Sequence, residues 1–424
     1  MLPIVGYPNV VSFGMSVFRK VFSRPQSRHF ANYLTGLMVC AKRTVKGIND
    51  SFPAHLDQSA MNHFLTDSTW SDEELDRARH ELINARLKEL GFEDGVLIVD
   101  DTIAHKTGKN MEGVGIHFDV SEGRYTLGHQ LVTTHYARGW ASVPLDFEIY
   151  IKRDKAEEGF KTKLELAKDL IRKAVDRNVP FSCVVFDAWY FNHEMTSFIE
   201  GLRKDWVASC KGNRQILVGR RKVRLSEWAA GLRRELFRPM KFKRADGSTK
   251  IYYVYEKMVT LVKHHQRVKV FVTYEDFDKE PSFFCTNRLD WGKSKALRRY
   301  AKRWEIDAFY RDAKQNLGLE EYELRKLRGV RRHLTMVFIA HALLELGLKQ
   351  NATLGKLTAC LETIGARCRR ACAEVLQSLI QTVLKLGEEV RDTKQILGML
   401  SSSRVQLRKM MKGGAAALLT ALTA

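Results

Sequence analysis

Residues 96–102 read VLIVDDT. Four apolar residues in succession, three of them β-branched, are typical of a strand that is buried on both faces of a sheet. A second run of this kind, Cys183–Phe186, is followed at once by Asp187, as the first is followed by Asp100. Such strands belong mainly to α/β proteins, so the pattern predicts an α/β fold in which two buried strands each end in an aspartate.

Five further segments set these strands in a larger order. Sequences typical of strands recur at Leu131–Thr134, Phe147–Ile151 and Trp206–Cys210. Apolar residues recur at helical spacing over Phe160–Ala174 and His193–Arg203. The chain then runs through three strands, a helix, a strand, a helix and a strand. The right-handed crossover rule sets the fourth strand parallel to the first, so we expect both aspartates at the same edge of the sheet. For each aspartate alone, a helix cap or turn former is the alternative.

A helix of about 25 residues is predicted over Lys293–Leu317. Four of its side chains share a stripe about 60° wide at about 100° per residue. These are Tyr300, Arg303, Asp307 and Lys314. Glu305 and Asp312 point to the opposite side of the same helix. A carboxylate beside a phenol and two cations suits a phosphodiester: Asp307 would bind a metal ion, and the other three side chains would hold phosphate oxygens. An exposed, salt-bridged helix face is the alternative.

The positive charge of the chain is concentrated in one region. The 424 residues carry a net charge of +21, and Gly201–Val270 contains 19 Lys or Arg against 5 Asp or Glu, a net +14. Strand-like Ile251–Tyr255 follows a hairpin signal at Ala245–Ser248, which predicts a basic β region. At this density of charge we expect contacts with a phosphate backbone, with solvated strand faces as the alternative. The candidate DNA contacts here are Arg220, Arg221, Lys222, Lys241 and Lys243.

Helical segments flank this core on both sides. Helical spacing begins at Arg28, and a helix start is predicted at Ser71. Apolar pairs recur every four residues from Val375 to Leu384, which suits either dimer contacts or packing onto the core of the same chain. We expect five regions: a helical DNA-binding or dimer region (1–90), a core in two parts (91–211 and 291–350), a basic β-rich insertion (212–290) and a helical C-terminal region (351–424).

The cysteine count and the hydropathy indicate a protein of a reducing compartment. Seven cysteines without a CxxC pair argue against a disulfide framework. Arg19 and Lys20 follow the apolar N-terminal stretch instead of preceding it, which is the wrong order for a signal peptide. No run reaches the roughly 18 apolar residues of a membrane span. We therefore expect a cytoplasmic, nucleoid-associated protein without a membrane partner.

Taken together, these motifs resemble the DDE transposases of bacterial insertion sequences. The shared features are Asp100 with Thr102 two positions later, Asp187 after a second apolar strand, and the spacing Tyr-x2-Arg-x3-acid-x6-Lys on a late helix. More narrowly, they resemble the group with a Tyr-Arg-Glu-Lys signature and a β-rich insertion before the third acid. The resemblance covers about Gln58 to Leu344 and includes the Arg- and His-containing text near Arg325.

The resemblance implies an RNase H-like core with Asp100, Asp187 and Asp307 as catalytic residues and metal ligands. Three clustered carboxylates repel one another unless divalent cations compensate them, which predicts two Mg²⁺ ions with Mn²⁺ as a substitute. The implied activity is cleavage of double-stranded DNA at terminal inverted repeats and strand transfer to target DNA. Synapsis of two ends requires a homodimer, and Tyr300, Arg303, Lys314 and Arg325 would contact DNA.

The chain departs from the family pattern at its third acid, which is usually Glu and here is Asp307. Glu305 could substitute for it, but the helical angles argue against this. Asp100 is preferred to Asp101 because it ends the apolar run and fits the Asp-x-Thr pattern. If the enzyme forms DNA hairpins, Trp228 or Trp291 could stack on a flipped base, and both could equally be core residues.

Two rival functions share this sequence pattern. One is a catalytically inactive or domesticated transposase that acts as a DNA-binding protein. The other is a structure-specific nuclease on the same fold, which would cut without requiring repeat sequence or joining ends.

Overall fold

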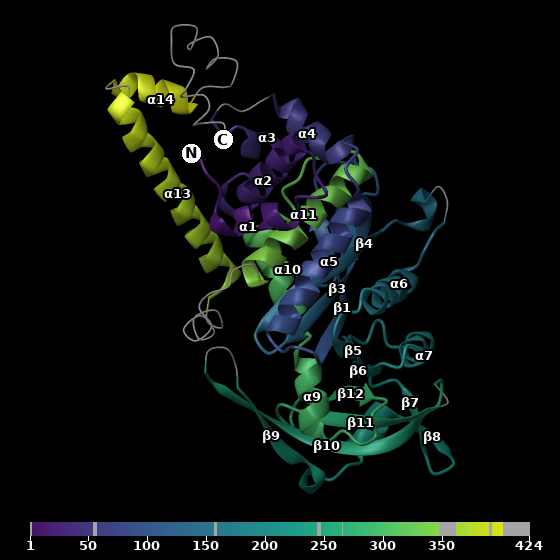
Figure 1. Cartoon of the computed structure of the whole chain (residues 1–424). Coiled ribbons are helices and arrows are strands. Elements are labelled where there is room, and N and C mark those ends of the chain that lie inside the picture. The colour runs from purple at the N-terminus through teal and green to yellow at the C-terminus, as the bar shows by residue number, and fades with distance from the viewer. Residues whose placement is uncertain are drawn as a thin grey trace. The chain divides into compact units, whose positions relative to one another are not determined.

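The computed structural model describes residues 2–53, 57–156, 159–243, 247–264, 266–346, 362–389 and 392–401. The chain divides into two compact units. The first contains residues 1–86, 103–130 and 309–424, and the second contains residues 87–102 and 131–308. Figure 1 shows the chain with its elements labelled. The expected division into five regions stays a prediction.

The second unit is built on a mixed sheet with helices on it. Its core strands run in the order β1, β5, β6 and β12, and α9 contacts β5 and β6 while α7 contacts β6 and α6 contacts β4. Figure 1 shows α6 and α7 on one side of β5 and β6 and α9 on the other. The bounds are β1 (Gly95–His105), β3 (Arg124–Arg138), β4 (Ala141–Tyr150), α6 (Lys163–Asp176), β5 (Phe181–Phe186), α7 (His193–Gly201), β6 (Asp205–Cys210), β12 (Ser282–Thr286) and α9 (Lys293–Ala301). This is the mixed α/β architecture of an RNase H-like core, as predicted.

Strands β1 and β5 are parallel, which confirms the orientation predicted by the crossover rule. Their last paired residues are Val99 and Phe186, so Asp100 and Asp187 are the next residues on two adjacent strands. The prediction that the first strand ends at Asp100 is wrong, because β1 continues to His105. It can continue because β3 pairs on its other side, where Thr133 Oγ1 donates to the Asp100 carbonyl at 3.4 Å. Asp100 therefore sits on a strand that is held by β3 after β5 has ended.

The basic insertion is β-rich, as predicted, and extends the same sheet. After β12 the order continues through β11, β10, β7 and β8, and β9 pairs with β10. The bounds are β7 (Gln215–Val218), β8 (Arg221–Arg224), α8 (Leu225–Ala230), β9 (Arg238–Lys243), β10 (Thr249–Leu261) and β11 (Gln266–Tyr274). The predicted hairpin is the antiparallel β9–β10 pair, and its turn lies partly outside the described residues.

The predicted long helix over Lys293–Leu317 is two helices, which corrects the sequence prediction. α9 ends at Ala301 and α10 (Trp304–Asn316) starts three residues later. At the junction the amide of Arg303 bonds the carbonyl of Tyr300 at 2.8 Å, a three-residue spacing in place of the four-residue spacing of an α-helix. This tight turn resets the helical phase, so angles counted at 100° per residue hold within α10 and do not carry from Tyr300 to Asp307.

The first unit is mainly helical, and its helix α2 contacts α1, α3, α4, α11 and α13. Its helices are α1 (Asn9–Val17), α2 (Arg24–Val39), α3 (Val45–Asn49), α4 (Gln58–Thr66), α5 (Asp72–Glu89), α11 (Leu327–Leu346), α13 (Ile364–Glu389) and α14 (Thr393–Ser401). Helix α10 begins in the second unit and belongs to the first unit from Phe309 onward. The predicted start of α5 is confirmed, since Ser71 Oγ accepts the amide hydrogen of Glu74 at 3.1 Å. Strand β2 (Gly115–Asp119), which the sequence did not predict, pairs antiparallel with β3. A membrane-crossing helix is absent from the part of the chain that the structure describes.

Candidate active site

Asp187 begins a tight turn directly after β5. Its Oδ1 accepts the amide hydrogens of Trp189 at 2.8 Å and Tyr190 at 3.3 Å, as a turn-forming aspartate does. These bonds fix the carboxylate at the end of the strand. The turn-forming role that the sequence left as an alternative is therefore present, and it also holds the carboxylate beside Asp100.

Asp100 is buried and lies in the field of two other acids. Burial is the main reason that the pKa of Asp100 rises from 3.8 to about 7. Arg303 works against this rise, and the negative charges of Asp187 and Asp101 add to it. A carboxyl group with this pKa is poised to lose its proton when a cation arrives near neutral pH.

Arg303 joins the carboxylates of the site. Its Nη1 lies 2.6 Å from Asp100 Oδ2, and its Nη2 lies 3.4 Å from Asp307 Oδ2. Burial opposes its charge, but the surrounding acids, Asp100 first and Asp187 among them, hold the pKa of Arg303 above its usual value. The turn between α9 and α10 is what carries this guanidinium to the strand ends.

Asp307 is the carboxylate of α10 that faces this cluster. Burial raises its pKa, Arg303 lowers it, and Asp187 raises it further. Glu305 instead pairs with Lys302, with Oε1 and Nζ 3.0 Å apart. The structure therefore brings Asp307, and not Glu305, to Arg303 and Asp187.

Asp101 has different neighbours from Asp100, because successive side chains of a strand point to opposite faces. Asp101 Oδ2 pairs with Lys163 at 3.1 Å, and its Oδ1 accepts the hydroxyl hydrogen of Tyr190 at 3.0 Å. The choice of Asp100 over Asp101 for the acid cluster thus agrees with the contacts that each side chain makes.

Tyr300 lies half-buried beside the same carboxylates. Burial raises the pKa of its phenol, while bonding to Ser209 and Arg303 lowers it and Asp187 raises it. Its ring packs against Phe284 with centroids 4.6 Å apart. Tyr300 thus contributes a neutral hydroxyl at the edge of the cluster.

Lys314 belongs to the first unit and has partners there. Its Nζ donates to the Ile103 carbonyl at 2.8 Å and pairs with Glu320 Oε1 at 2.9 Å. Glu320 also pairs with His105 Nδ1 at 3.1 Å. The cation of the signature is therefore held in a network of ion pairs within its own unit.

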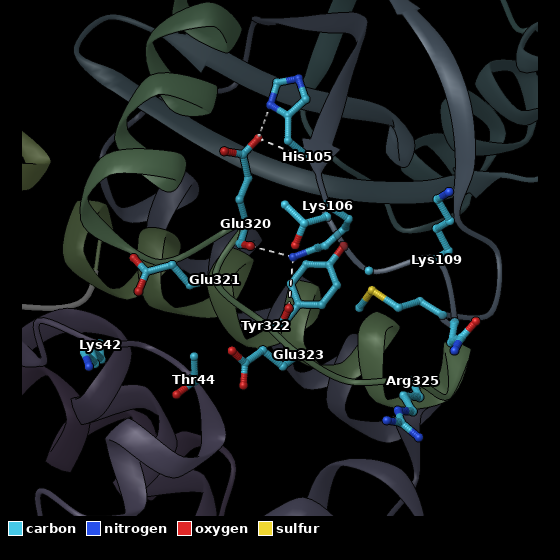
Figure 2. Close-up of a pocket in the computed structure, with 14 residues that line it drawn as sticks. Lys42, Thr44, His105, Lys106, Lys109, Glu320, Glu321, Tyr322, Glu323 and Arg325 are labelled. Carbon is cyan, nitrogen blue, oxygen red and sulfur yellow. Dashed lines mark hydrogen bonds and ion pairs between the residues drawn. The ribbon is translucent and has the colours of Figure 1, made fainter. Parts of the chain in front are cut away.

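The predicted basic contacts lie on exposed surfaces. Arg220, Arg221 and Lys222 are exposed in the β7–β8 hairpin, and Lys241 is exposed on β9. Lys243 ends β9, and its side chain lies outside the described residues. Arg325 is exposed in the first unit. It lines an open cavity of about 640 Å³ together with other basic and acidic side chains, among them Lys106, Glu320 and Glu323 (Figure 2). None of the three predicted catalytic acids lines this cavity.

Two exposed tryptophans in the second unit were not predicted as site residues. Trp189 follows Asp187 by two residues and is 50% exposed; Trp304 follows Arg303 and is 67% exposed. Trp291, which was predicted as a stacking candidate, is only 2% exposed and is surrounded by Arg288, Lys295 and Arg299. Trp291 therefore offers no open face to a base, which agrees with the alternative that it is a core residue. Trp189 and Trp304 could have been found from the sequence, because Trp189 lies two residues after Asp187 and Trp304 lies directly after Arg303.

The donor set of the cluster fits a divalent cation of the hard, oxygen-preferring kind. Asp100 on β1 and Asp307 on α10 contact one guanidinium, and Asp187 at the end of β5 lies in its field, so this single charge offsets only part of theirs. Carboxylate oxygens are the ligands that Mg²⁺ and Mn²⁺ prefer. Among the described residues, ligand atoms within 4.8 Å of one another occur in His105, Asp119 and Glu122 of the first unit, whereas the three aspartates of the cluster do not lie that close together. There His105 Nε2 already contacts Asp119 Oδ2 at 2.9 Å.

Comparisons with known proteins identify the family of the chain. The profile of the family described as DDE superfamily endonuclease matches residues 17–233, a little over half of the chain, and includes Asp100 and Asp187. A protein of Microchaete diplosiphon described as "Probable transposase for insertion sequence element IS701" is 28% identical over 177 residues, which are 41% of this chain and 46% of the relative. The match thus spans about half the length of that relative. Because the profile matches more than half of the chain, the protein belongs to the DDE superfamily of endonucleases.

Proposed function

We propose that this protein is the transposase of a bacterial insertion sequence. It binds the terminal inverted repeats of the element as duplex DNA, hydrolyses the phosphodiester at each end and joins the freed 3′-hydroxyl to target DNA. The observation that carries the proposal is that, in a chain of the DDE family, Arg303 contacts Asp100 and Asp307 and lies in the field of Asp187. The partial similarity to a probable insertion-sequence transposase supports the same activity.

In this proposal the three aspartates hold two Mg²⁺ ions, which Mn²⁺ can replace. Bound there, the ions would supply Lewis-acid chemistry: they make water nucleophilic at neutral pH and stabilise the leaving oxygen. Asp100 would be one of the ligands, and with a pKa of about 7 it would lose its proton readily near neutral pH. Asp187 is already oriented by the two amides of its turn, so little reorganisation is needed at that ligand.

The side chains around the acids position the DNA. Arg303 and Tyr300 would hold phosphate oxygens beside the scissile bond, since a guanidinium binds phosphate through two parallel hydrogen bonds and a phenol donates one. Lys314 would add a further phosphate contact. The exposed indoles of Trp189 and Trp304 offer faces on which a base near the cut could stack.

Residues farther from the acids hold the rest of the duplex. The basic insertion, with Arg220, Arg221, Lys222, Lys241 and Lys243, would follow the phosphate backbone, and Arg325 would add a contact in the first unit. Joining two ends requires two active sites, so we propose that the protein works as a homodimer on DNA.

The proposal is tested with a labelled duplex cut from the DNA that borders the gene. The wild-type protein with Mg²⁺ should nick this duplex at the end of the repeat. Asp187→Ala should bind the duplex in EDTA with unchanged affinity, and with Mg²⁺ it should cut the duplex at least about 10³-fold more slowly, because it loses a ligand of both the metal and the transition state. Asp169→Ala is the matched control, since Asp169 is an exposed residue of α6 that pairs with Lys161 on the surface.

Each rival function predicts a different result in this assay. Binding without any Mg²⁺-dependent cutting would identify an inactive, DNA-binding protein. If unrelated DNA inhibits the cutting as strongly as the repeat DNA does, and no joined product forms, the protein is a structure-specific nuclease. Unchanged cutting by Asp187→Ala would show that the proposed site is not the active site.

A further inference from the structure

Arg303 contacts two of the three acids of the cluster. Its guanidinium binds Asp100 at 2.6 Å and Asp307 at 3.4 Å and lies in the field of Asp187. The side chain is only 17% exposed, and that of Asp100 is 14% exposed. One buried cation therefore stands among the three carboxylates that are proposed to hold metal ions.

Both oxygens of Asp100 have partners in this arrangement. Oδ1 accepts the amide hydrogen of Asp101 at 2.9 Å, and Oδ2 accepts from Arg303. A cation that binds Asp100 through Oδ2 must therefore compete with the guanidinium. When all three carboxylates are ionised, a single guanidinium offsets only one of their negative charges, so divalent cations that replace it compensate more of the charge.

We propose that Arg303 is a positioning residue that couples metal binding to DNA binding. Without DNA it lies across Asp100 and Asp307 and weakens metal binding there, and when metal ions and DNA are both present it moves to a phosphate oxygen of the DNA. The inference rests on the proposed function of the same site. It adds that metal and DNA each favour the other through one side chain.

The backbone at Arg303 suits such a change of partner. The residue lies in the three-residue-spaced turn between α9 and α10, outside the regular hydrogen-bond pattern of either helix. A guanidinium also binds carboxylate and phosphate with the same forked geometry. By thermodynamic reciprocity, metal ions must then tighten DNA binding by the same factor by which DNA tightens metal binding.

The first test measures metal affinity without DNA. Mn²⁺ is titrated into the DNA-free protein, and free Mn²⁺ is followed by electron paramagnetic resonance. Arg303→Gln should bind Mn²⁺ about tenfold more tightly than the wild type, because one charge-assisted ion pair no longer competes. Arg303→Lys, which keeps the charge but cannot span two carboxylates, should lie between the two.

Arg299→Gln is the matched control for this titration. Arg299 lies one turn earlier on α9, is 15% exposed and pairs with Asp94 at 2.8 Å, outside the acid cluster. It should leave the Mn²⁺ affinity within about twofold of the wild type. Circular dichroism and thermal unfolding of each variant establish that the fold is retained.

The second test measures the coupling itself. A fluorescein-labelled duplex from the DNA that borders the gene is titrated with protein in Ca²⁺, which lets the complex form without cutting, and in EDTA. Ca²⁺ should tighten binding by the wild type about tenfold and by Arg303→Gln less than about threefold.

The possible outcomes separate the two proposals. Mn²⁺ affinity that is unchanged or weaker in Arg303→Gln, or equal Ca²⁺ effects in both proteins, overturns the role of Arg303 and leaves the nuclease proposal standing. A wild-type protein that binds neither Mn²⁺ nor Ca²⁺ at the cluster overturns both.

Discussion

At the scale of single residues, the site depends on which acid of each neighbouring pair faces Arg303. Asp100 contacts Arg303, while Asp101 contacts Lys163 and Tyr190. On α10, Asp307 contacts Arg303 and Glu305 contacts Lys302. The usual third acid of the family is a glutamate, so the shorter Asp307 is the residue whose role most needs a direct test.

Asp307→Ala should reduce Mg²⁺-dependent nicking at least about 10³-fold, whereas Glu305→Ala should reduce it less than about threefold. The reason is that only Asp307 shares Arg303 with Asp100. Single-turnover cleavage of a labelled end measures both rates. Loss of cutting in Glu305→Ala with activity kept in Asp307→Ala would exchange the two assignments.

The raised pKa of Asp100 predicts a pH dependence of stability in the metal-free protein. Its pKa is about 7 in the folded chain against 3.8 ordinarily, so the folded state binds a proton more tightly than the unfolded state. The stability from this group is full below pH 3.8 and is lost as the pH rises through about 7. Asp100→Asn lacks this titration. The Tm of the variant relative to the wild type should therefore rise between these pH values, and a constant difference would contradict the assignment.

At the scale of elements, the hydrophobic pattern predicted most strands and helices because their burial is periodic along the sequence. Buried runs such as Cys183–Phe186 and the amphipathic stretch over Phe160–Ala174 correspond to β5 and α6. Strand β2 was missed because it has only five residues and exposes Ile116 and Phe118. The break before α10 was missed because the sequence there contains neither proline nor glycine.

Helix α11 is fixed within the first unit by one buried arginine. Arg332 is fully buried, donates to the carbonyls of Ser68 at 2.9 Å and Trp70 at 2.8 Å, and pairs with Asp72 at 2.9 Å. Its guanidinium carbon lies 3.5 Å from the centroid of the Trp70 ring. These contacts tie α11 to the segment between α4 and α5.

Arg332→Gln should lower the free energy of unfolding by about 3–5 kcal/mol, because it leaves several buried acceptors without a donor. Arg328→Gln, on the exposed side of the same helix, should lower it by less than about 1 kcal/mol. Urea unfolding of the two variants makes the comparison. Equal effects would show that Arg332 does not anchor α11.

At the scale of the whole molecule, composition alone predicted a polyanionic partner, and the motif predicted which acids matter. Asp100, Asp187, Asp307 and Arg303 could be proposed from the sequence because each stands in a short motif, at two strand ends and in the segment that forms the α9–α10 turn and α10. The contact of Arg303 with Asp100 spans 203 positions of the chain, and the pairing of Lys314 with Glu320 needs a turn after α10. These contacts depend on tertiary packing, which spacing does not encode.

The basic insertion should supply part of the salt dependence of DNA binding. Replacing Arg220, Arg221 and Lys222 together by alanine should reduce the slope of log K against log salt by about 0.9 for each phosphate that these side chains neutralise in the wild type. Arg124→Ala, an exposed arginine of the first unit, is the control. Fluorescence anisotropy across a salt series measures the slopes. An unchanged slope in the triple variant would place the backbone contacts elsewhere.

The most direct test of the whole account is end joining in a single reaction. Wild-type protein, Mg²⁺, a labelled duplex from the border of the gene and a supercoiled target plasmid are incubated together, and the label that becomes covalently attached to the plasmid is measured. We predict joined product with the wild type and with Asp169→Ala, and none with Asp187→Ala. Joining by Asp187→Ala at the wild-type rate, or cut ends that are never joined by the wild type, would contradict the account.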